Sequence, residues 1–331
     1  MPETPGPIRL RHARAAGPFM TMKPMFCLCA VVAMVAGPAA AQAPAPAQAP
    51  AAGEDHTVEV APGIYNVTWG NSWGNMGLNV GVSVGADGLL LIDAQEEKAV
   101  PRLIARIREI TDKPVRFVVN THWHFDHVGG NAVFSKEGAA IVAQENTRTR
   151  LMTDQPNPLG RAAQHAFAPA FWPRITFADR LTLHVNGDDV EVLHFPNGHT
   201  DGDAIVLFRK ADVLFAADLF NNTDYTRVDL RGGSLDGMIA AYDALLPILD
   251  DAVKVVPGRG PVGTKKDLVE YRAVMVTLRD RITGLIKDGK TLAEAVAAKP
   301  TKDFDARWGN GPIRPDQLVE EIYSDLKRTA H

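Results

Sequence analysis

Four side chains that can bind a metal ion lie within the six residues His122–His127, whose sequence is HWHFDH. The segment follows an apolar, β-branched run at 115–120, which predicts a buried strand. Because a strand alternates its side chains, a chain that leaves it extended projects the first, third and fifth residues of the segment to one side, and a bend brings His127 beside them. Imidazoles with a carboxylate suit zinc, iron and other first-row metals better than calcium or magnesium. The pattern therefore predicts a metal site at a strand end.

Apolar periodicity elsewhere predicts a chain of short strands and longer helices. Asn186-Gly187-Asp188 is typical of a hairpin turn between two of the strands. Strands are expected at 64–69, 78–84, 88–92, 115–120, 140–143, 181–185, 190–195, 204–209, 213–217 and 254–256. Helices are expected at 100–110, 235–249, 265–286 and 315–327.

The HWHFDH segment resembles the H-x-H-x-D-H signature of the metallo-β-lactamase superfamily, and later motifs follow in that family's order. Gly198–Asp203 resembles its third-histidine motif, Phe215–Phe220 the strand end with the bridging aspartate, and Val255–Pro261 the P-G-H-G strand end. The resemblance covers residues 57–290, and such an ordered set is highly specific. It implies an α/β (α+β) fold, the four-layer αβ/βα sandwich, with two sheets face to face, helices outside and metals at one edge.

The resemblance assigns six side chains to two metal positions: His122, His124 and His199 to the first, Asp126 and His127 to the second, and Asp218 as the bridge. Zinc is the expected metal, with iron or manganese as alternatives. Three neutral imidazoles leave an open position where the pKa of a water falls towards about 7, so hydroxide is available at neutral pH. Asp126 is also a candidate catalytic residue, because it would orient this nucleophile towards a carbonyl.

Arg259 departs from the family pattern, because it stands where the last metal-binding histidine is usual. A guanidinium keeps its proton in a protein and cannot coordinate a cation. We therefore expect one tightly bound metal and a second that is weak or partial. Two roles stay open: Arg259 is a catalytic and substrate-binding residue that grips a carboxylate, or it forms an ion pair with Asp218 or Asp126 in a metal-poor site.

Residues 1–41 have the pattern of a signal peptide, in which Lys23 precedes an apolar run at 25–35 and small residues offer a cleavage site. Met20 or Met22 is expected to be the true start. The apolar run is too short to span a membrane. A periplasmic or secreted protein is therefore predicted.

The remaining chain is expected to hold an Ala/Pro-rich linker at 42–55, a catalytic domain at 56–290 and a helical extension at 291–331 that packs on the same domain. Both cysteines, Cys27 and Cys29, lie within the signal segment. The mature chain would therefore lack the thiolate that one β-lactamase subclass of the family uses at its second metal.

Two irregular segments are expected to form walls of a substrate cleft. Residues 69–76 include Trp73, and residues 154–174 include Trp172. These aromatic side chains either hold an apolar ligand or anchor the loops to the body of the protein. Asn222, just past the bridging aspartate, is a further substrate-binding candidate, as a hydrogen-bond donor to an oxyanion; a turn built on two asparagines is the alternative.

The predicted function is an exported metal-dependent hydrolase whose activated hydroxide attacks the carbonyl of a β-lactam, lactone, ester or thioester, with promiscuous β-lactamase activity included. Two different functions stay open: an iron-dependent oxidoreductase of the persulfide dioxygenase type, and a non-catalytic metal-binding accessory protein. A formal charge of −4 provides no basic excess for a phosphate backbone, so nucleic acid is not an expected partner. A small-molecule substrate, no membrane span and a monomer or small homo-oligomer are expected.

Overall fold

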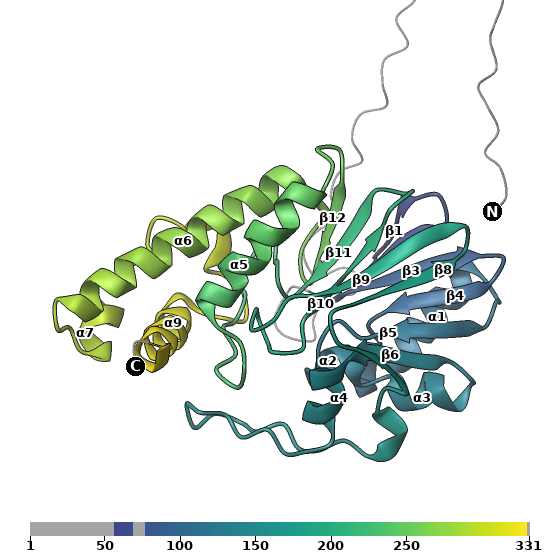
Figure 1. The fold of residues 1–331 in the computed structure, drawn as a ribbon, viewed down its shortest axis with the longest axis horizontal. Coiled ribbons are helices and arrows are strands. Elements are labelled where there is room, and N and C mark those ends of the chain that lie inside the picture. The colour runs from purple at the N-terminus through teal and green to yellow at the C-terminus, as the bar shows by residue number, and fades with distance from the viewer. Residues whose placement is uncertain (1–55, 69–76, 330–331) are drawn as a thin grey trace, which may run out of the picture. The chain divides into compact units, whose positions relative to one another are not determined.

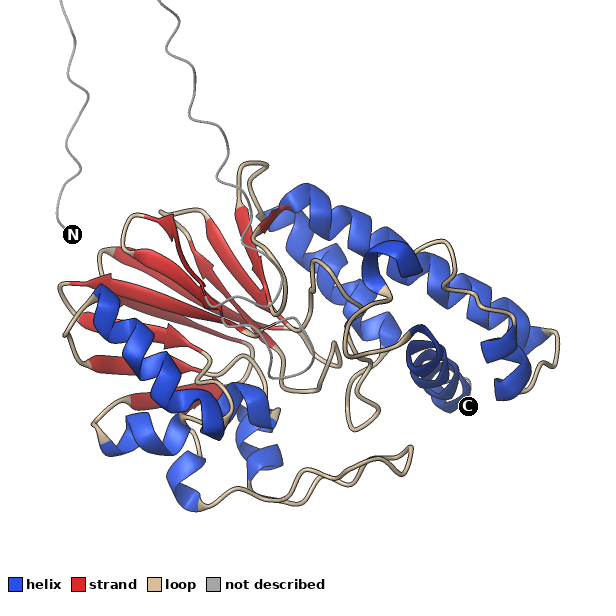
Figure 2. Cartoon of the chain, turned by 180° about the vertical axis from the view of Figure 1, so that it is seen from behind, coloured by secondary structure: helices blue, strands red, loops and turns tan. Residues whose placement is uncertain are grey.

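Two mixed β-sheets form the centre of the protein. In the computed structural model, which describes residues 56–68 and 77–329, a seven-stranded sheet packs against a six-stranded sheet. Helices cover the outer faces of both sheets (Figures 1 and 2). This is the four-layer αβ/βα arrangement that the motifs predict, so the predicted fold class is confirmed.

The first sheet keeps its strands in chain order. Strands β1 to β4 are antiparallel to their neighbours, and β4 to β7 are parallel. The seven strands are β1 (His56–Ala61), β2 (Ile64–Thr68), β3 (Asn79–Gly85), β4 (Gly88–Ile92), β5 (Val115–Val119), β6 (Ala140–Gln144) and β7 (Ile175–Phe177).

The second sheet runs from β13 back to β8. Strands β11 and β12 pair in parallel, and the other neighbours are antiparallel. Its strands are β8 (Arg180–Val185), β9 (Asp188–His194), β10 (Ala204–Phe208), β11 (Val213–Ala217), β12 (Lys254–Pro257) and β13 (Gly263–Thr264).

The helices divide between the two outer faces (Figures 1 and 2). Those on the side of the first sheet are α1 (Val100–Ile110), α2 (Phe125–Val128), α3 (Asn131–Lys136) and α4 (Glu145–Leu151). Those on the side of the second are α5 (Leu235–Leu245), α6 (Lys265–Lys287), α7 (Leu292–Ala297), α8 (Asp305–Trp308) and α9 (Pro315–Thr329). Short 3-10 turns are η1 (Glu97–Ala99), η2 (Pro169–Phe171) and η3 (Leu246–Ile248).

Three apolar clusters fill the interfaces between the four layers. The middle cluster joins the sheets and includes Ile92 of β4 and Phe215 of β11. A Cβ at Gly81 of β3 would lie 2.5 Å from Ile92 Cδ1 and 2.6 Å from Phe215 Cε1, so glycine allows the sheets to approach. The outer clusters hold α1 through Leu103 and α6 through Leu278. Each fully buried aliphatic side chain contributes about 1.5–3 kcal/mol.

Parallel pairing brings four strand ends to one edge of the sandwich. Strands β4 and β5 are parallel neighbours in the first sheet, as are β11 and β12 in the second. The segments that leave these four strands carry Asp93, His122, Asp218 and Arg259 respectively. Because the carboxyl ends of parallel strands lie at the same edge, side chains far apart in the sequence meet there.

Most predicted elements match the structure, and the differences lie at their ends. The helix expected at 235–249 stops at Leu245 and continues as the 3-10 turn η3. Pro247 explains this, because it lacks a backbone N–H and its ring clashes with the carbonyl four residues back. The expected signal peptide and linker, residues 1–55, lie outside the described residues.

Helices α7, α8 and α9 make up most of the segment expected to be a C-terminal extension. Leu318 and Ile322 of α9 are buried in the same apolar cluster as Leu278 of α6. The two helices therefore share one core. Among the described helices, none combines the length and apolar character needed to cross a membrane.

Candidate metal centre

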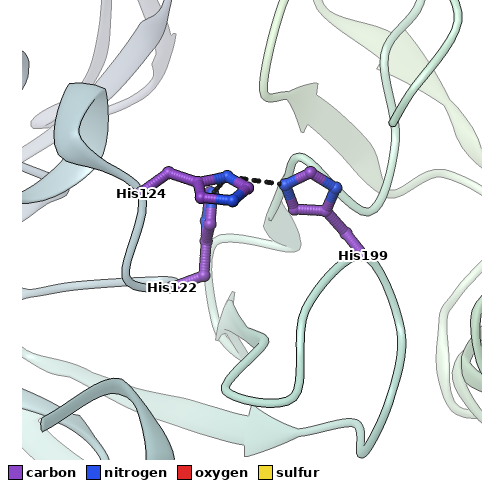
Figure 3. Close-up of side chains that lie close together, drawn as sticks. All are labelled: His122, His124 and His199. Carbon is purple, nitrogen blue, oxygen red and sulfur yellow. Dashed lines mark hydrogen bonds between the residues drawn. The ribbon is translucent and has the colours of Figure 1, made fainter. Parts of the chain in front are cut away.

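Three imidazoles from two segments converge on one point (Figure 3). His122 and His124 follow β5, and His199 lies in the loop between β9 and β10. His122 Nε2 and His199 Nε2 each lie 3.0 Å from His124 Nδ1. Nitrogens that share a tetrahedral zinc at about 2.0–2.1 Å stand roughly 3.3 Å apart. The spacing therefore suits three ligands of one ion.

The opposite ring nitrogens of two of these histidines face strong acceptors. His124 Nε2 lies 2.6 Å from Asp229 Oδ2, and His199 Nδ1 lies 2.8 Å from the carbonyl oxygen of Arg227. Because each acceptor needs a hydrogen-bond donor, the ring nitrogen that faces it carries the proton. The other ring nitrogen then keeps its lone pair, which points at the convergence point. The surroundings thus select the ligand nitrogens before any metal binds.

Asp93, at the end of β4, supports two more histidines. Its Oδ2 accepts a hydrogen bond from Thr121 Oγ1 at 2.7 Å and lies 2.7 Å from His127 Nδ1. Thr121 Oγ1 in turn lies 3.1 Å from His122 Nδ1. Because the threonine hydroxyl donates to Asp93, its lone pair accepts from His122 Nδ1–H. One buried carboxylate therefore orients both rings.

Burial keeps the three converging histidines neutral. It lowers the pKa of His199 to about 4, lowers that of His124, and lowers that of His122 well below its ordinary value. Three buried lone pairs pointing at each other repel without a cation between them, and neutral imidazole is the form that binds a metal. The residues therefore fit the metal that the fold family implies at this position.

The position of the second metal has fewer histidine ligands than the position of the first. His127 Nε2 lies 3.6 Å from Asp218 Oδ2 and 3.8 Å from Asp126 Oδ2, and it is buried with no hydrogen-bond partner in the described part of the chain. Burial lowers the pKa of His127, but the carboxylates around it raise that pKa well above the ordinary value. A Cβ at Gly258 would lie 2.1 Å from Asp218 Oδ1, so glycine allows the backbone that follows β12 to lie against this carboxylate.

Arg259 lies beside the position of the second metal. Its Nη2 lies 2.5 Å from Asp126 Oδ2 and 3.8 Å from Asp218 Oδ2, and its buried Nη1 has no hydrogen-bond partner within residues 56–68 and 77–329. Burial opposes ionisation of both aspartates, but Arg259 and His127 lower the pKa of Asp126 and hold that of Asp218 well below its usual range. A cation placed between these carboxylates would be repelled by the guanidinium charge.

The backbone is strained at two positions beside these ligands. Asp93 has φ of 65°, and Ala217, just before Asp218, has φ of 47°. A non-glycine residue in this left-handed region costs about 1–2 kcal/mol, and such residues cluster where the fold must aim a side chain. Both lie at the carboxyl ends of inner strands, β4 and β11, where they turn the chain towards the metal centre.

A cavity of 790 Å³ opens above the centre, and His124, His199, Asp126, Asp218 and Arg259 line its base. Its lining combines apolar side chains with charged ones of both signs, the carboxylates besides Asp126 and Asp218 being Glu96, Glu97 and Asp224. The apolar lining comes from Phe125, Phe167, Ala162, Ala163, Ala166, Pro312 and Ile313. The cations besides Arg259 are Lys98, Arg161, Arg227 and Arg231.

The predicted substrate residues lie in different places. Trp73 lies outside the described residues. Trp172 packs against the buried cluster of Trp123, and its Nε1 donates to the carbonyl of Phe167 at 2.9 Å, so it anchors the loop and is absent from the cavity lining. Asn222 Nδ2 donates to the carbonyl of Pro261 at 3.0 Å. Its neighbour Asn221 lines the cavity instead.

Sequence reasoning missed most of the groups that orient the ligands. Asp93 could have been found, because it ends a predicted strand at the same sheet edge as the histidines. Asp229 and Arg231 lie in an irregular segment with no periodic signal; Arg231 Nε donates to Asp229 Oδ1 at 2.8 Å and its guanidinium stacks 4.5 Å from the Trp123 ring. Asp224 is buried in the cavity lining, and neither of its carboxylate oxygens has a hydrogen-bond partner among the residues that the structure describes.

Comparison with known proteins agrees with this geometry. Residues 74–259 match the metallo-beta-lactamase superfamily. The chain is 26% identical to a linear primary-alkylsulfatase of Pseudomonas sp. (strain ATCC 19151), over 71% of the chain and 48% of that protein. It is 28% identical to the acyl-coenzyme A thioesterase MBLAC2 of Gallus gallus, over 42% of the chain and 54% of that protein. The chain thus spans about half the length of these two relatives.

Solved structures share the fold at low sequence identity. A metallo-beta-lactamase from Pontibacter korlensis is 21% identical with a TM-score of 0.57, over 67% of this chain and 99% of that one. A sec-alkyl sulfatase double mutant is 18% identical with a TM-score of 0.61, over 82% of this chain and 50% of that one. The family-model match over residues 74–259, with the ordered motifs and the converging histidines, shows that the chain belongs to the metallo-β-lactamase superfamily.

Proposed function

We propose that this protein is a metal-dependent hydrolase that cleaves an ester, thioester, lactone or β-lactam carrying both an apolar part and an anionic group. One observation carries the proposal: three neutral histidines with preset tautomers converge at the base of a cavity of 790 Å³. Zinc bound there would lower the pKa of a water and supply a nucleophile at neutral pH. Iron and manganese also suit this donor set.

The chain's own residues supply the remaining steps. Arg259 Nη2 holds Asp126 as a carboxylate at the cavity base, where it can accept a hydrogen bond from the attacking water and orient it. Arg259 Nη1 is buried and has no hydrogen-bond partner among the described residues, so a movement of its side chain would be needed before it donates to the carbonyl oxygen or to a carboxylate of the substrate. The ion pair with Asp126 through Nη2 is the contact that the structure contains, and the catalytic and substrate-binding role through Nη1 is part of the proposal.

The cavity wall supports an amphiphilic substrate. Phe125, Phe167 and Ile313 provide apolar surface, and Arg227 and Arg231 provide positive charge near the metal centre. An anionic group beside these cations would direct the scissile bond to the base of the cavity. Alkyl sulfates and acyl-coenzyme A thioesters, for which the two relatives are named, both join an apolar chain to anionic groups.

Hydrolysis of an alkyl sulfate ester is the second candidate. The alignment with the alkylsulfatase over 71% of the chain favours it, together with the arginines of the cavity lining. A panel matched in chain length separates the two: p-nitrophenyl acyl esters, acyl lactones, acyl-coenzyme A thioesters and nitrocefin against alkyl sulfates. Turnover of a carbonyl substrate supports the first proposal, and sulfate release alone replaces it with the second.

Metal analysis of the purified protein separates the hydrolase from an iron-dependent oxidoreductase and from a non-catalytic metal-binding protein. Iron with oxygen consumption on a glutathione persulfide would establish the oxidoreductase, and bound metal without turnover on any substrate would establish an accessory protein. Zinc with turnover on the panel supports the hydrolase. The same preparation gives the oligomeric state by light scattering, for which we propose a monomer or small homo-oligomer.

We further propose that the protein is exported to the periplasm or secreted. The support is the sequence at 20–41, with a basic residue, an apolar run and small residues at the expected cleavage site.

A further inference from the structure

A buried glutamate of the C-terminal helix contacts two arginines that line the cavity. Glu321 of α9 is 2% exposed. Its Oε1 lies 2.7 Å from Arg161 Nη1 and 3.6 Å from Arg227 Nε, and its Oε2 accepts from the backbone N–H of Val228 at 3.2 Å. Because burial removes this carboxylate from water, the two arginines and the backbone N–H of Val228 stabilise it in its place.

The segment that Glu321 holds is the one that orients two metal ligands. The carbonyl of Arg227 accepts from His199 Nδ1 at 2.8 Å, and Asp229 Oδ2 lies 2.6 Å from His124 Nε2. The backbone N–H of Asp229 also donates to the carbonyl of His199 at 3.1 Å. Val228, between these two residues, is the one bonded to Glu321. A shift of this backbone would therefore move both acceptors at once.

Other residues of α9 hold the rest of the same segment. Asp325 Oδ2 accepts from the N–H of Leu235 at 2.8 Å, at the start of α5. Arg328 donates to the carbonyl oxygens of Leu230 at 3.2 Å and Gly233 at 3.0 Å. Helix α9 lies beside α5 and α6 (Figures 1 and 2) and shares their apolar cluster, so its glutamate is presented from a rigid support.

We propose that Glu321 is a positioning residue for the metal centre: through the backbone at 227–229 it holds the acceptors that orient His199 and His124. The inference rests on one part of the proposed function, which is that the three histidines bind a metal. Glu321 touches neither the histidines nor the base of the cavity. Its effect on the centre therefore passes through the carbonyl of Arg227 and the carboxylate of Asp229.

Glu320 provides a matched control on the same helix. It forms an ion pair with the same Arg161, through the other guanidinium nitrogen. Its side chain is 34% exposed, against 3% for Glu321. Glu320→Gln removes one carboxylate from Arg161 but leaves the bond to Val228 intact. Comparison of the two variants separates the positioning effect from the loss of an ion pair with the loop.

The test measures zinc affinity by competition with a chromophoric chelator, together with the visible spectrum of the Co²⁺-substituted protein. Loss of groups that orient metal ligands typically lowers metal affinity about 10–100-fold. We expect Glu321→Gln to lose about 10-fold or more and to change the cobalt spectrum, and Glu320→Gln to stay within about twofold of wild type. Glu321→Asp, which keeps the charge but is too short, should fall between them and serves if Glu321→Gln does not fold.

Wild-type zinc affinity and an unchanged cobalt spectrum in a folded Glu321→Gln or Glu321→Asp protein would overturn the proposal, even if either variant melted at lower temperature. Equal losses in the Glu320 and Glu321 variants would overturn it too, because the effect would then come from Arg161. A wild-type protein that binds no metal at these histidines would instead refute the proposed function.

Discussion

Arg259→His should convert the centre from one tightly bound metal to two. In the structure, Arg259 Nη2 lies 3.8 Å from Asp218 Oδ2, while His127 Nε2 lies 3.6 Å from the same oxygen. A cation held between His127 and Asp218 would thus stand about 4 Å from the guanidinium. At an effective dielectric of 20, two unit charges at this distance repel by about 4 kcal/mol. Removing that repulsion strengthens the second site by several powers of ten, before the new imidazole adds its own bond.

The assay is zinc per chain at matched free zinc, measured by elemental analysis after equilibrium dialysis. Arg259→Gln is the control, because it removes the charge without adding a ring nitrogen. We expect about one zinc in the wild type, an intermediate value for Arg259→Gln and two for Arg259→His. Two tightly bound metals in the wild type, with no change in either variant, would show that the guanidinium does not oppose the second ion.

The same variants report on substrate binding. If Arg259 Nη1 holds the substrate, KM rises in both variants, because the lost contact exists before the transition state. An unchanged KM with altered kcat would limit the residue to its bond with Asp126.

Three further outcomes are expected. His199→Ala should abolish hydrolysis and metal binding together, because it removes one of three ligands of the first metal; near-normal turnover with that position empty would disprove the assignment. Burial raises the pKa of Asp224 to about 7 from 3.8, so in the metal-free protein the native state binds the extra proton between these values, and its stability falls as the pH rises from about 4 to about 7. The Asp224→Asn variant should lack this slope, so its gain in the free energy of unfolding over wild type should be larger at pH 8 than at pH 4, by up to about 4 kcal/mol. Urea unfolding of both proteins measures this gain, and an equal gain at the two pH values would contradict the prediction. Mass spectrometry of the exported protein should show a start near Gln42, and a mature form that retains Lys23 would rule out the proposed cleavage.

Most of the candidate metal ligands could be predicted because they lie soon after an apolar run whose period is readable. The segment His122–His127 follows β5, and Asp218 follows β11. Local spacing is enough to predict these residues, because strand alternation and the position of the strand end decide which side chains can face a metal. The ordered motifs then identify the fold, and the fold places His199 opposite the first pair.

The groups that orient those ligands could not be predicted in the same way. Asp229 lies 105 positions from His124, and the acceptor for His199 is a backbone carbonyl, which carries no residue signature. Trp172 was a substrate candidate by composition, yet its packing against the Trp123 cluster makes it an anchor for its loop. Burial and long-range contacts decide such roles, and neither is visible in local periodicity.

By itself, the sequence determined most of the element order, the superfamily and the set of candidate metal ligands, because these depend on residue type and on spacing along the chain. Only the tertiary structure decided what surrounds them. It placed Arg259 against Asp126, gave the cavity both apolar and charged lining residues, and set Glu321 of the last helix behind the segment that orients His199. The physical reason is that hydrogen bonding, charge and desolvation act across space, so their partners are chosen only when the layers have packed.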